Sequence, residues 1–434
     1  MSDPRPGLLA GLGLGRRELR GWALYDWANS AFITTILQLF PIYFARFAAA
    51  DLPQAEAGRR FALATTAGTL GIALLAPLLG AIADHARMKK RMLATFLALG
   101  VVATAALYLV GRGEWLMGLL LFVVGNIGVN GAQVFSDSLL PHIARPHEVD
   151  RVATTAFALG YLGGGLLFGL NILWIQMPEL LGLPDAAAAM RLSFLSVAVW
   201  WTLFSVPLLI WVPEPRVSPP GPRRALLRVG LSRLRATLRE LRAHRDAALF
   251  LAAFLIYSDG INTIVRMGTL FGTEMGIATS SLLFAVLMVQ FVAVPCALAF
   301  GSLAQRIGPR AAILLGLLVY VGITVVGYRM QTAADFFVLA GLVALVQGGT
   351  QALSRSLFAT LVPQHKTSEF FGFFGVVERF GGVLGPALFA AVISATGSGR
   401  GAILGLIVFF VLGALLLLRV DVERGRAVAR AAVP

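Results

Sequence analysis

Long apolar runs with few charged residues follow one another along almost the whole chain. A helix needs about 20 mostly apolar residues to cross a hydrocarbon core of about 30 Å. Twelve runs approach or exceed this length, and in lipid such runs satisfy their backbone hydrogen bonds as helices. The predicted spans are 20–47, 60–83, 91–111, 115–140, 152–176, 191–212, 248–273, 279–304, 310–329, 335–361, 369–395 and 401–419. The pattern therefore predicts an all-α polytopic membrane protein with twelve transmembrane helices.

The composition supports lipid as the solvent. Of the 434 residues, 58% are hydrophobic and 13% are charged, whereas a typical soluble domain is about 25% charged. The net charge of +14 could indicate a nucleic-acid partner, but the arginines lie in short tracts between hydrophobic runs. We therefore expect no nucleic acid. The single cysteine, Cys296, excludes a disulfide framework and a cysteine-based metal site.

Basic residues are concentrated in alternate connections between the runs. Cytoplasmic loops of membrane proteins carry such an excess of Lys and Arg. The basic connections contain Arg16, Arg17 and Arg20; Arg87, Lys89, Lys90 and Arg91; Arg145 and Arg151; the segment 216–245; Arg306 and Arg310; Lys366; and Arg424, Arg426 and Arg430. Both termini should be cytoplasmic, which requires an even number of spans. Residues 1–19 lack a continuous apolar core, so the first span itself should direct insertion.

The segment 213–246 divides the chain into an N-terminal six-helix half, residues 1–212, and a C-terminal half, residues 247–434. Its first part is rich in proline, which favours an extended chain. Leucines then recur among arginines, as is typical of a basic amphipathic helix on the anionic cytoplasmic leaflet. A surface for a partner or for regulation is the alternative interpretation.

Short motifs recur in the same order in the two halves. Recurrence of this kind indicates an internal duplication, here of six helices. The matched pairs are Asp26-x-x-Asn29 with Asp259-x-x-Asn262, Gly80-Ala-Ile-Ala-Asp84 with Gly301-Ser-Leu-Ala-Gln305, and Ser136-Asp137-Ser138-Leu139 with Ser354-Arg355-Ser356-Leu357. The second copy of the Asp84 motif has an amide, Gln305, in place of the acid, which weakens the expectation of a matching charged gate.

Polar residues within the spans lie mainly on the first, fourth, seventh and tenth. Polar groups are costly in lipid and normally face a cavity or each other. Those of the fourth span are spaced by four, three and four residues, which places them on one helical face. We expect the substrate to contact Asn29, Asn130, Gln133, Asn262, Arg266, Gln347 and Gln351. Structural hydrogen bonds between helices are the alternative role for the amides of the fourth span.

Charged residues in and beside the spans are candidates for coupling and gating. Asp26, Asp259 and Glu378 could sense a charge on the substrate or carry a proton, because a buried carboxylate can take one up. Asp137 and Arg355 occupy equivalent positions with opposite charges, which favours a salt bridge at a cytoplasmic gate over a static structural pair. Asp84 and Arg91 are expected at the same gate.

The sequence contains none of the motifs H-E-x-x-H, Walker A or G-x-S-x-G. We therefore expect neither an enzyme nor a cofactor. The run Gly163-Gly164-Gly165 lies in the middle of a span, where close helix packing is the natural explanation.

Two groups of motifs resemble a known family. The stretch from Gly80 to Arg91, GAIADHARMKKR, resembles the major-facilitator signature between the second and third helices, with Arg87 where a glycine is usual. The accompanying stretches WALYDWANSAF from Trp22, SDSLLP from Ser136, DGINTI from Asp259 and QGGTQALSRS from Gln347 resemble the fungal vacuolar amino-acid effluxers and their bacterial relatives. The resemblance covers nearly the whole chain. It implies the major-facilitator fold, with spans one, four, seven and ten around the pathway, and export of amino acids or similar small solutes.

The expected function is that of a secondary transporter working by alternating access, with a proton as the candidate coupling ion. We expect a monomer in contact with membrane lipids. The arginine-rich, lysine-poor and alanine-rich usage favours a bacterium with a GC-rich genome, and hence the cytoplasmic (inner) membrane. Alternative cargoes are an amphiphilic metabolite, a siderophore or a drug. A membrane receptor or scaffold that does not transport is the alternative from another class.

Overall fold

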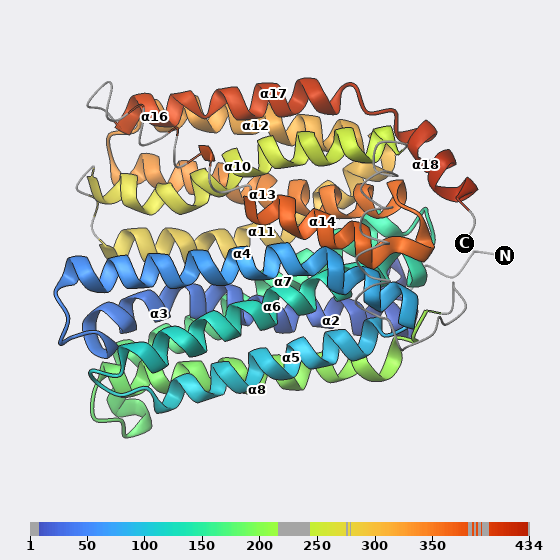
Figure 1. Cartoon of the computed structure of the whole chain (residues 1–434). Helices are drawn as coiled ribbons and strands as arrows, with labels where there is room; N and C mark the ends of the chain where they lie inside the picture. The colour runs from blue at the N-terminus through green and yellow to red at the C-terminus, as the bar shows by residue number, and fades with distance from the viewer. Residues whose placement is uncertain are drawn as a thin grey trace.

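The computed structural model describes residues 8–215, 244–274, 279–380 and 399–432, together with residues 277, 384, 385, 388 and 392. It is a bundle of long helices that run side by side (Figure 1). In this described part, nine helices are long and apolar enough to cross a membrane, and one bent pair brings the number to ten. The long helix Gln54–Ala86 and the helix beginning at Thr367 make the architecture consistent with the twelve spans predicted.

The N-terminal half forms one group of helices, drawn in blue to green in Figure 1. Its first span is interrupted by two π-helical turns, which are irregularities often found at functional sites. The elements are α1 Leu8–Gly11, α2 Arg17–Ala31, η1 Phe32–Ile36, α3 Leu37–Tyr43, η2 Phe44–Ala48, α4 Gln54–Ala86, α5 Lys89–Ala106, η3 Leu107–Leu109, α6 Trp115–Ile143, α7 Val149–Gln176, η4 Pro178–Leu181 and α8 Ala186–Trp211.

The C-terminal half forms a second group, drawn in yellow to red, and α18 lies at an angle to the bundle (Figure 1). Its elements are α10 Arg245–Glu274, α11 Thr279–Ile307, α12 Pro309–Arg329, α13 Ala333–Leu361, η6 Gln364–Lys366, α14 Thr367–Phe380, α16 Gly399–Gly405, α17 Ile407–Leu417 and α18 Val422–Ala431. Both chain ends lie at the same end of the bundle (Figure 1), which we call the terminal end.

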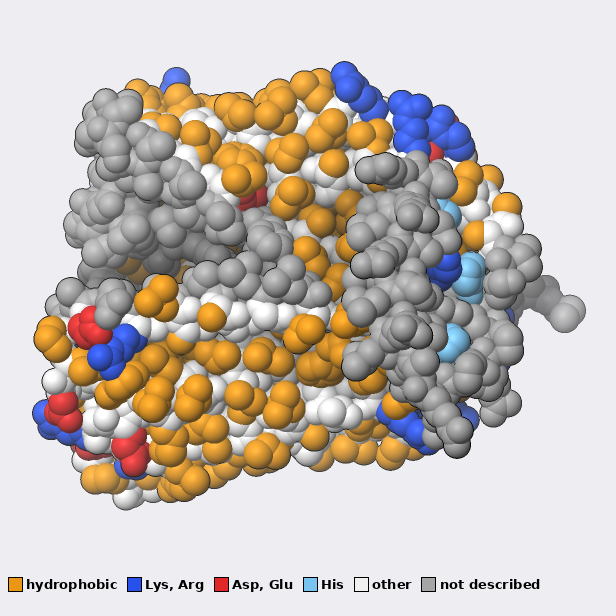
Figure 2. Space-filling view, viewed as in Figure 1, with side chains coloured by type: hydrophobic (Ala, Val, Ile, Leu, Met, Phe, Trp, Pro, Cys, Tyr) orange, Lys and Arg blue, Asp and Glu red, His pale blue; other side chains and the backbone are white. Residues whose placement is uncertain are grey.

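Apolar side chains cover the sides of the bundle, and charged side chains gather at its two ends (Figure 2). Exposed leucines such as Leu109 and Leu203, which are 69% and 61% exposed, are the expected outer surface of a protein whose solvent is lipid.

The prediction that the glycine run of the fifth span serves close packing is confirmed. A Cβ on Gly163 would lie 2.6 Å from the Trp27 ring, and one on Gly164 would lie 3.0 Å from the Ser30 carbonyl.

The two halves meet along two pairs of helices, α4 with α14 and α7 with α11, and α13 also packs against α7.

The predicted span boundaries differ from those of the observed helices by a few residues at most positions. The second span begins earlier than predicted, at Gln54 rather than at residue 60. Residues 216–243, which include the predicted amphipathic helix of the linker, lie outside the described residues.

Arg87, which replaces the usual glycine of the signature, follows the last residue of α4 with φ 52° and ψ 55°. This left-handed conformation costs a residue with a Cβ roughly 1–2 kcal/mol. The backbone conformation explains why the signature favours glycine, and it turns the chain sharply from α4 into α5.

Candidate functional site

Arg355 of α13 connects the two halves through a buried ion-pair network. Its Nη2 lies 2.6 Å from Asp26 Oδ2. Its Nη1 lies 2.8 Å from Asp137 Oδ1 and 3.3 Å from Asp26 Oδ1. Asp26, Asp137 and Arg355 are only 7%, 5% and 3% exposed. Arginine suits this position because its planar fork of donors can serve two carboxylates at once.

Two aromatic rings complete the surroundings of the guanidinium. The Cζ atom of Arg355 lies 4.7 Å from the centre of the Trp22 ring and 4.5 Å from that of Phe157. Such cation–π contacts stabilise a desolvated guanidinium by about 2 kcal/mol. The network holds two carboxylates and one guanidinium, so it has one negative charge in excess when both carboxylates are ionised.

A chain of amides leads away from this network. Gln133 Nε2 donates to Asp137 Oδ1 at 2.8 Å, and Asn29 Nδ2 donates to Gln133 Oε1 at 2.7 Å. Asn29 is 3% exposed, and its Oδ1 accepts no hydrogen bond from the described residues. A buried acceptor without a donor costs about 1–3 kcal/mol. Asn29 Oδ1 is therefore a place where a donor group on a cargo would be stabilised.

A second cluster joins the halves at the terminal end, between α4, α5, α6 and α14. Asp84 Oδ1 lies 2.7 Å from Lys89 Nζ, and Asp84 Oδ2 accepts the Glu369 N–H at 3.0 Å. Lys89 Nζ also donates to the Thr367 hydroxyl and lies 3.0 Å from His142 Nε2. Asp84 thus links the end of α4 to the first turn of α14, where a carboxylate is favoured by the unpaired N–H groups and the helix dipole.

The basic residue at this contact is Lys89 rather than Arg91, the residue expected from the sequence. Lys89 is 4% exposed, whereas Arg91 lies on the outside of the first turn of α5. Glu214 fixes this turn by accepting the N–H groups of Lys89 at 2.7 Å and Lys90 at 3.0 Å. Burial is the main influence on Glu214 and raises the pKa of its carboxyl, although the two N–H donors act in the opposite direction.

The equivalent contact in the second copy of the motif is neutral on one side. Gln305, at the end of α11, accepts a hydrogen bond from Arg151 at the start of α7. Nearby, Ser356 Oγ donates to Asp150 Oδ1 at 2.6 Å. The amide therefore keeps the bond between the halves but without the carboxylate charge that Asp84 supplies in the first copy.

The backbones of the two halves also approach each other closely at the terminal end, where glycines lie at the contact. A Cβ on Gly80 of α4 would overlap the Ser368 carbonyl oxygen, and one on Gly372 of α14 would lie 2.6 Å from Pro77 Cα. Ser368 Oγ donates to Ser138 Oγ at 3.0 Å. The terminal end is therefore closed by direct helix–helix contact.

The other residues expected to contact substrate lie on three helices, α6, α10 and α13. Asn130, Asn262, Gln347 and Gln351 are half-buried. Asn130 Nδ2 donates at 2.7 Å to a carbonyl one turn earlier in its own helix, so this bond is not one between helices. The side chain of Arg266 lies outside the described residues.

The other two candidate proton carriers have different surroundings from Asp26. Asp259 is fully buried in the C-terminal half, where its Oδ2 accepts the Gly385 N–H at 2.9 Å. This bond to the backbone of its own half favours a structural role. Glu378 lies exposed on α14, close enough to Asp137 to interact with it electrostatically. Of the three, Asp26 is thus the carboxylate that the structure places on Arg355.

Sequence reasoning missed Lys89, His142 and Thr367, because nothing in a basic or polar loop residue marks it as buried. It also missed the hydrogen bond from Gln290 of α11 to Thr34 Oγ1, at 3.0 Å, which joins the halves within the spans. The position of Lys89 and His142 near the ends of adjacent predicted spans was the available signal.

Comparison with known proteins identifies the family. The model of the family described as "Vacuole effluxer Atg22 like" matches residues 61–430. The chain belongs to this family. The MFS-type transporter YxiO of Bacillus subtilis (strain 168), described as uncharacterized, is 36% identical to it over 417 residues, covering 95% of this chain and 97% of the relative. Autophagy-related protein 22 of Eremothecium gossypii is 25% identical over 474 residues, covering 95% and 92%.

Solved structures place this Atg22-family chain in the major-facilitator fold. A double-tryptophan mutant of XylE superposes with a TM-score of 0.71 at 14% identity, covering 97% of this chain and 98% of that one. FucP in its outward conformation gives a TM-score of 0.66 at 13% identity, covering 94% and 99%. The predicted fold is confirmed, and the protein is a multi-pass membrane transporter of the major facilitator superfamily.

Proposed function

We propose that this Atg22-family protein exports amino acids or similar small zwitterionic solutes by alternating access, as a monomer in a bacterial cytoplasmic membrane. The terminal end faces the cytoplasm in this proposal. Its support is the concentration of Lys and Arg in the connections at that end, as the positive-inside rule requires.

The observation that carries the proposal is the buried ion-pair network of Arg355 with Asp26 and Asp137. The network crosses between the halves, so the terminal end opens only when Arg355 separates from both carboxylates. Breaking a buried ion pair without replacement costs about 3–5 kcal/mol. A zwitterion offers that replacement, because its carboxylate can pair with Arg355 while its ammonium group pairs with Asp26 or Asn29 Oδ1.

Exchange of partners of this kind would make opening depend on cargo. A ligand shifts a conformational equilibrium only by its difference in affinity for the two states. Here the cargo pairs with the separated network, so its binding energy stabilises the state that is open to the cytoplasm, where an exporter takes up its cargo. Gate residues Asp84 and Lys89 close the same end in the absence of cargo.

A proton is the proposed coupling ion. The network has one carboxylate more than it has guanidinium groups, and a proton on Asp26 or Asp137 would neutralise that excess. Release of Arg355 to the cargo carboxylate would leave the cargo ammonium group as one cation for two carboxylates. A proton on the second carboxylate would then link proton and cargo through the same three side chains.

Counterflow in proteoliposomes tests the cargo. Vesicles containing the purified protein are loaded with unlabelled amino acids, and uptake of a labelled amino-acid mixture is measured. We expect accumulation that is lost in Arg355→Gln and kept in Arg112→Gln, a change at an exposed loop residue. Absence of accumulation by folded protein would remove amino acids as cargo and favour an amphiphile exporter or a receptor.

Coupling is tested in the same vesicles with an imposed pH gradient. The proposal expects the gradient to drive net movement of a cargo identified by counterflow. It expects Asp137→Asn, which leaves one carboxylate for one guanidinium, to exchange cargo without responding to the gradient. An undiminished response in this variant would exclude Asp137 from coupling.

A further inference from the structure

A cavity of about 620 Å³ lies at the terminal end, apart from the Arg355 network and between the two halves. Its N-terminal side is formed by the residues before α2 and at the start of α7. Its C-terminal side is formed by the end of α11, the start of α12 and α18. The volume is in the usual range for small-molecule sites.

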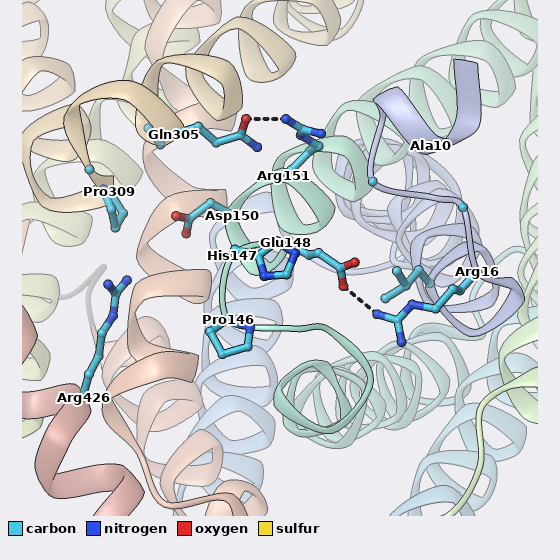
Figure 3. A pocket seen from close by; sticks show the side chains of 15 residues that line it. Ala10, Arg16, Pro146, His147, Glu148, Asp150, Arg151, Gln305, Pro309 and Arg426 are labelled. Carbon is cyan, nitrogen blue, oxygen red and sulfur yellow. Dashed lines mark hydrogen bonds and ion pairs between the residues drawn. The ribbon is translucent and has the colours of Figure 1, made fainter. Parts of the chain in front are cut away.

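Three guanidinium groups line this cavity, contributed by Arg16, Arg151 and Arg426. Arg426 reaches in from α18 on the opposite side of the view from Arg16, and Arg151 lies above both (Figure 3). Two carboxylates, Glu148 and Asp150, line it as well. The charged side chains of the lining therefore carry one positive charge in excess.

One of the two carboxylates forms an ion pair, and the other accepts a hydrogen bond from an uncharged hydroxyl. Glu148 Oε2 lies 2.6 Å from Arg16 Nη2 and accepts the Arg145 N–H at 3.0 Å. Partial burial opposes ionisation of Glu148, but these hydrogen bonds outweigh it and hold the pKa of the carboxyl below its ordinary value. Asp150 accepts the Ser356 hydroxyl. Arg16 is thus neutralised locally.

Arg151 and Arg426 have weaker partners. Arg151 donates to the uncharged amide of Gln305. Arg426 donates from Nη1 to Glu423, which is 85% exposed, and from Nε to the Thr360 hydroxyl. Its Nη2 makes no hydrogen bond to the described residues. Asp150 lines the same cavity and attracts Arg426 electrostatically. One carboxylate therefore faces two guanidinium groups from opposite halves, and an anion between the guanidinium groups would neutralise the remaining positive charge.

Two helices begin at the same cavity. Glu148 and Gly308 precede the first residues of α7 and α12, and neither helix start has a side-chain capping bond. Unpaired N–H groups at helix starts add to the attraction of the guanidinium groups for an anion. Phosphate oxygens match both kinds of donor, and arginine binds them with two parallel hydrogen bonds.

We propose that this cavity binds a phosphate ester between Arg151 and Arg426, and that the bound anion holds the terminal end closed. The closing effect follows from the position of the two arginines on opposite halves, because separation of the halves removes one side of the site. The phosphate comes either from a lipid headgroup or from a soluble ester. The site is independent of the cargo and of the proposed function.

The test uses the full-length purified protein and two forms of the probe. Binding of sn-glycerol 3-phosphate is measured by calorimetry in detergent at constant ionic strength, with glycerol as the neutral control. Phosphatidic acid in phosphatidylcholine nanodiscs is the lipid form, measured as the shift in unfolding temperature relative to phosphatidylcholine alone. Binding in either arm identifies the source of the phosphate.

A matched pair of variants separates this site from general attraction to a basic surface. Arg426→Gln removes a lining guanidinium whose hydrogen bonds to the described residues lie within its own half. Arg430→Gln removes an exposed one from the same helix. We expect Arg426→Gln to weaken binding about tenfold or more and Arg430→Gln to leave it within about twofold. Equal loss in both variants, or no binding in either arm, overturns the proposal.

The closing effect is measured separately. Spin labels replace exposed Arg145 of the N-terminal half and Ile307 of the C-terminal half, which is 46% exposed, in a Cys296→Ser background. Glycerol 3-phosphate should increase the population with the shorter distance between labels. An unchanged or longer distance at saturating ester would overturn the closing effect. Neither measurement requires transport, so its outcome does not depend on the identity of the cargo.

Discussion

Arg355 Nη2 and Asp26 Oδ2 lie 2.6 Å apart although the two residues are separated by 329 positions in the chain. Asp26 belongs to the first span and Arg355 to the tenth, so this bond joins helices of different halves. The same guanidinium also reaches Asp137 of the fourth span. One side chain therefore holds three of the four helices that the sequence indicated as the lining of the pathway.

Replacing Arg355 should abolish transport. Arg355→Gln leaves two buried carboxylates without a cation, and loss of a buried ion pair costs about 3–5 kcal/mol. We expect a reduction of at least about 100-fold in exchange rate in proteoliposomes. Arg355→Lys should not restore activity, because an ammonium group lacks the fork that serves Asp26 and Asp137 together. Wild-type exchange by the lysine variant would contradict a role for the two-carboxylate geometry.

Lys89 and Arg91 provide a direct test of which base acts at the gate. Lys89→Met leaves Asp84 buried without its ion-pair partner, and should destabilise the closed state by about 3–5 kcal/mol. Arg91→Gln, at an exposed position two residues away, should change it by less than about 1 kcal/mol. Labelling of a cysteine placed at Ser138, which is buried at the interface of the halves, reports opening. Equal labelling of the two variants would assign no special role to Lys89.

Gly80 should be indispensable for closure of the terminal end. Gly80→Ala places a methyl group against the Ser368 carbonyl, where overpacking costs about 1–3 kcal/mol. Gly71→Ala is the matched control, since Gly71 lies in the same helix with nothing within 4 Å of an added Cβ. The same cysteine assay should show greater opening for Gly80→Ala only. Closure of this variant to the wild-type extent would show that the helices can shift to accommodate the methyl group.

Asn29 should contribute to cargo affinity. Asn29→Ala removes the unpaired buried Oδ1 and the bond to Gln133, while the contacts of Arg355 remain. We expect KM in proteoliposome uptake to increase about tenfold, with a smaller change in kcat, because one hydrogen bond to a charged group contributes about 1.5–3 kcal/mol. A fall in kcat at constant KM would instead place Asn29 in the conformational step.

The Arg16–Glu148 pair predicts a dependence of stability on pH at the terminal end. The pKa of Glu148 is lowered in the folded protein, so the pair stabilises the fold above the ordinary carboxyl pKa of about 4.3. This contribution is lost as the pH falls through the lowered pKa. Both side chains are partly exposed, at 40% and 22%, so the effect is at most about 1 kcal/mol.

The measurement compares the unfolding temperatures of wild type and Glu148→Gln in detergent. The wild type should be the more stable at about pH 7, and the difference should shrink toward zero as the pH approaches the lowered carboxyl pKa. A difference that stays constant over this range would show that the pair contributes through packing rather than through charge.

The sequence by itself determined the class of fold, because the requirement that backbone groups be paired in lipid turns each long apolar run into a helix. It also determined which helices carry polar groups, since spacing by three and four residues fixes one face of a helix. The opposite charges of Asp137 and Arg355 at matching positions predicted their proximity, which the structure shows at 2.8 Å.

Only the tertiary structure decided which of the other charges meet. Asp26 and Asp259 look equivalent in the sequence, yet one bonds Arg355 and the other a backbone N–H in its own half. Lys89 and Arg91 are equally basic, but the sharp turn at Arg87, with φ 52°, is followed by a buried Lys89 and an exposed Arg91. Helical periodicity is local, whereas pairing across two halves depends on how they pack. That packing follows from contacts between residues hundreds of positions apart, which no local pattern encodes.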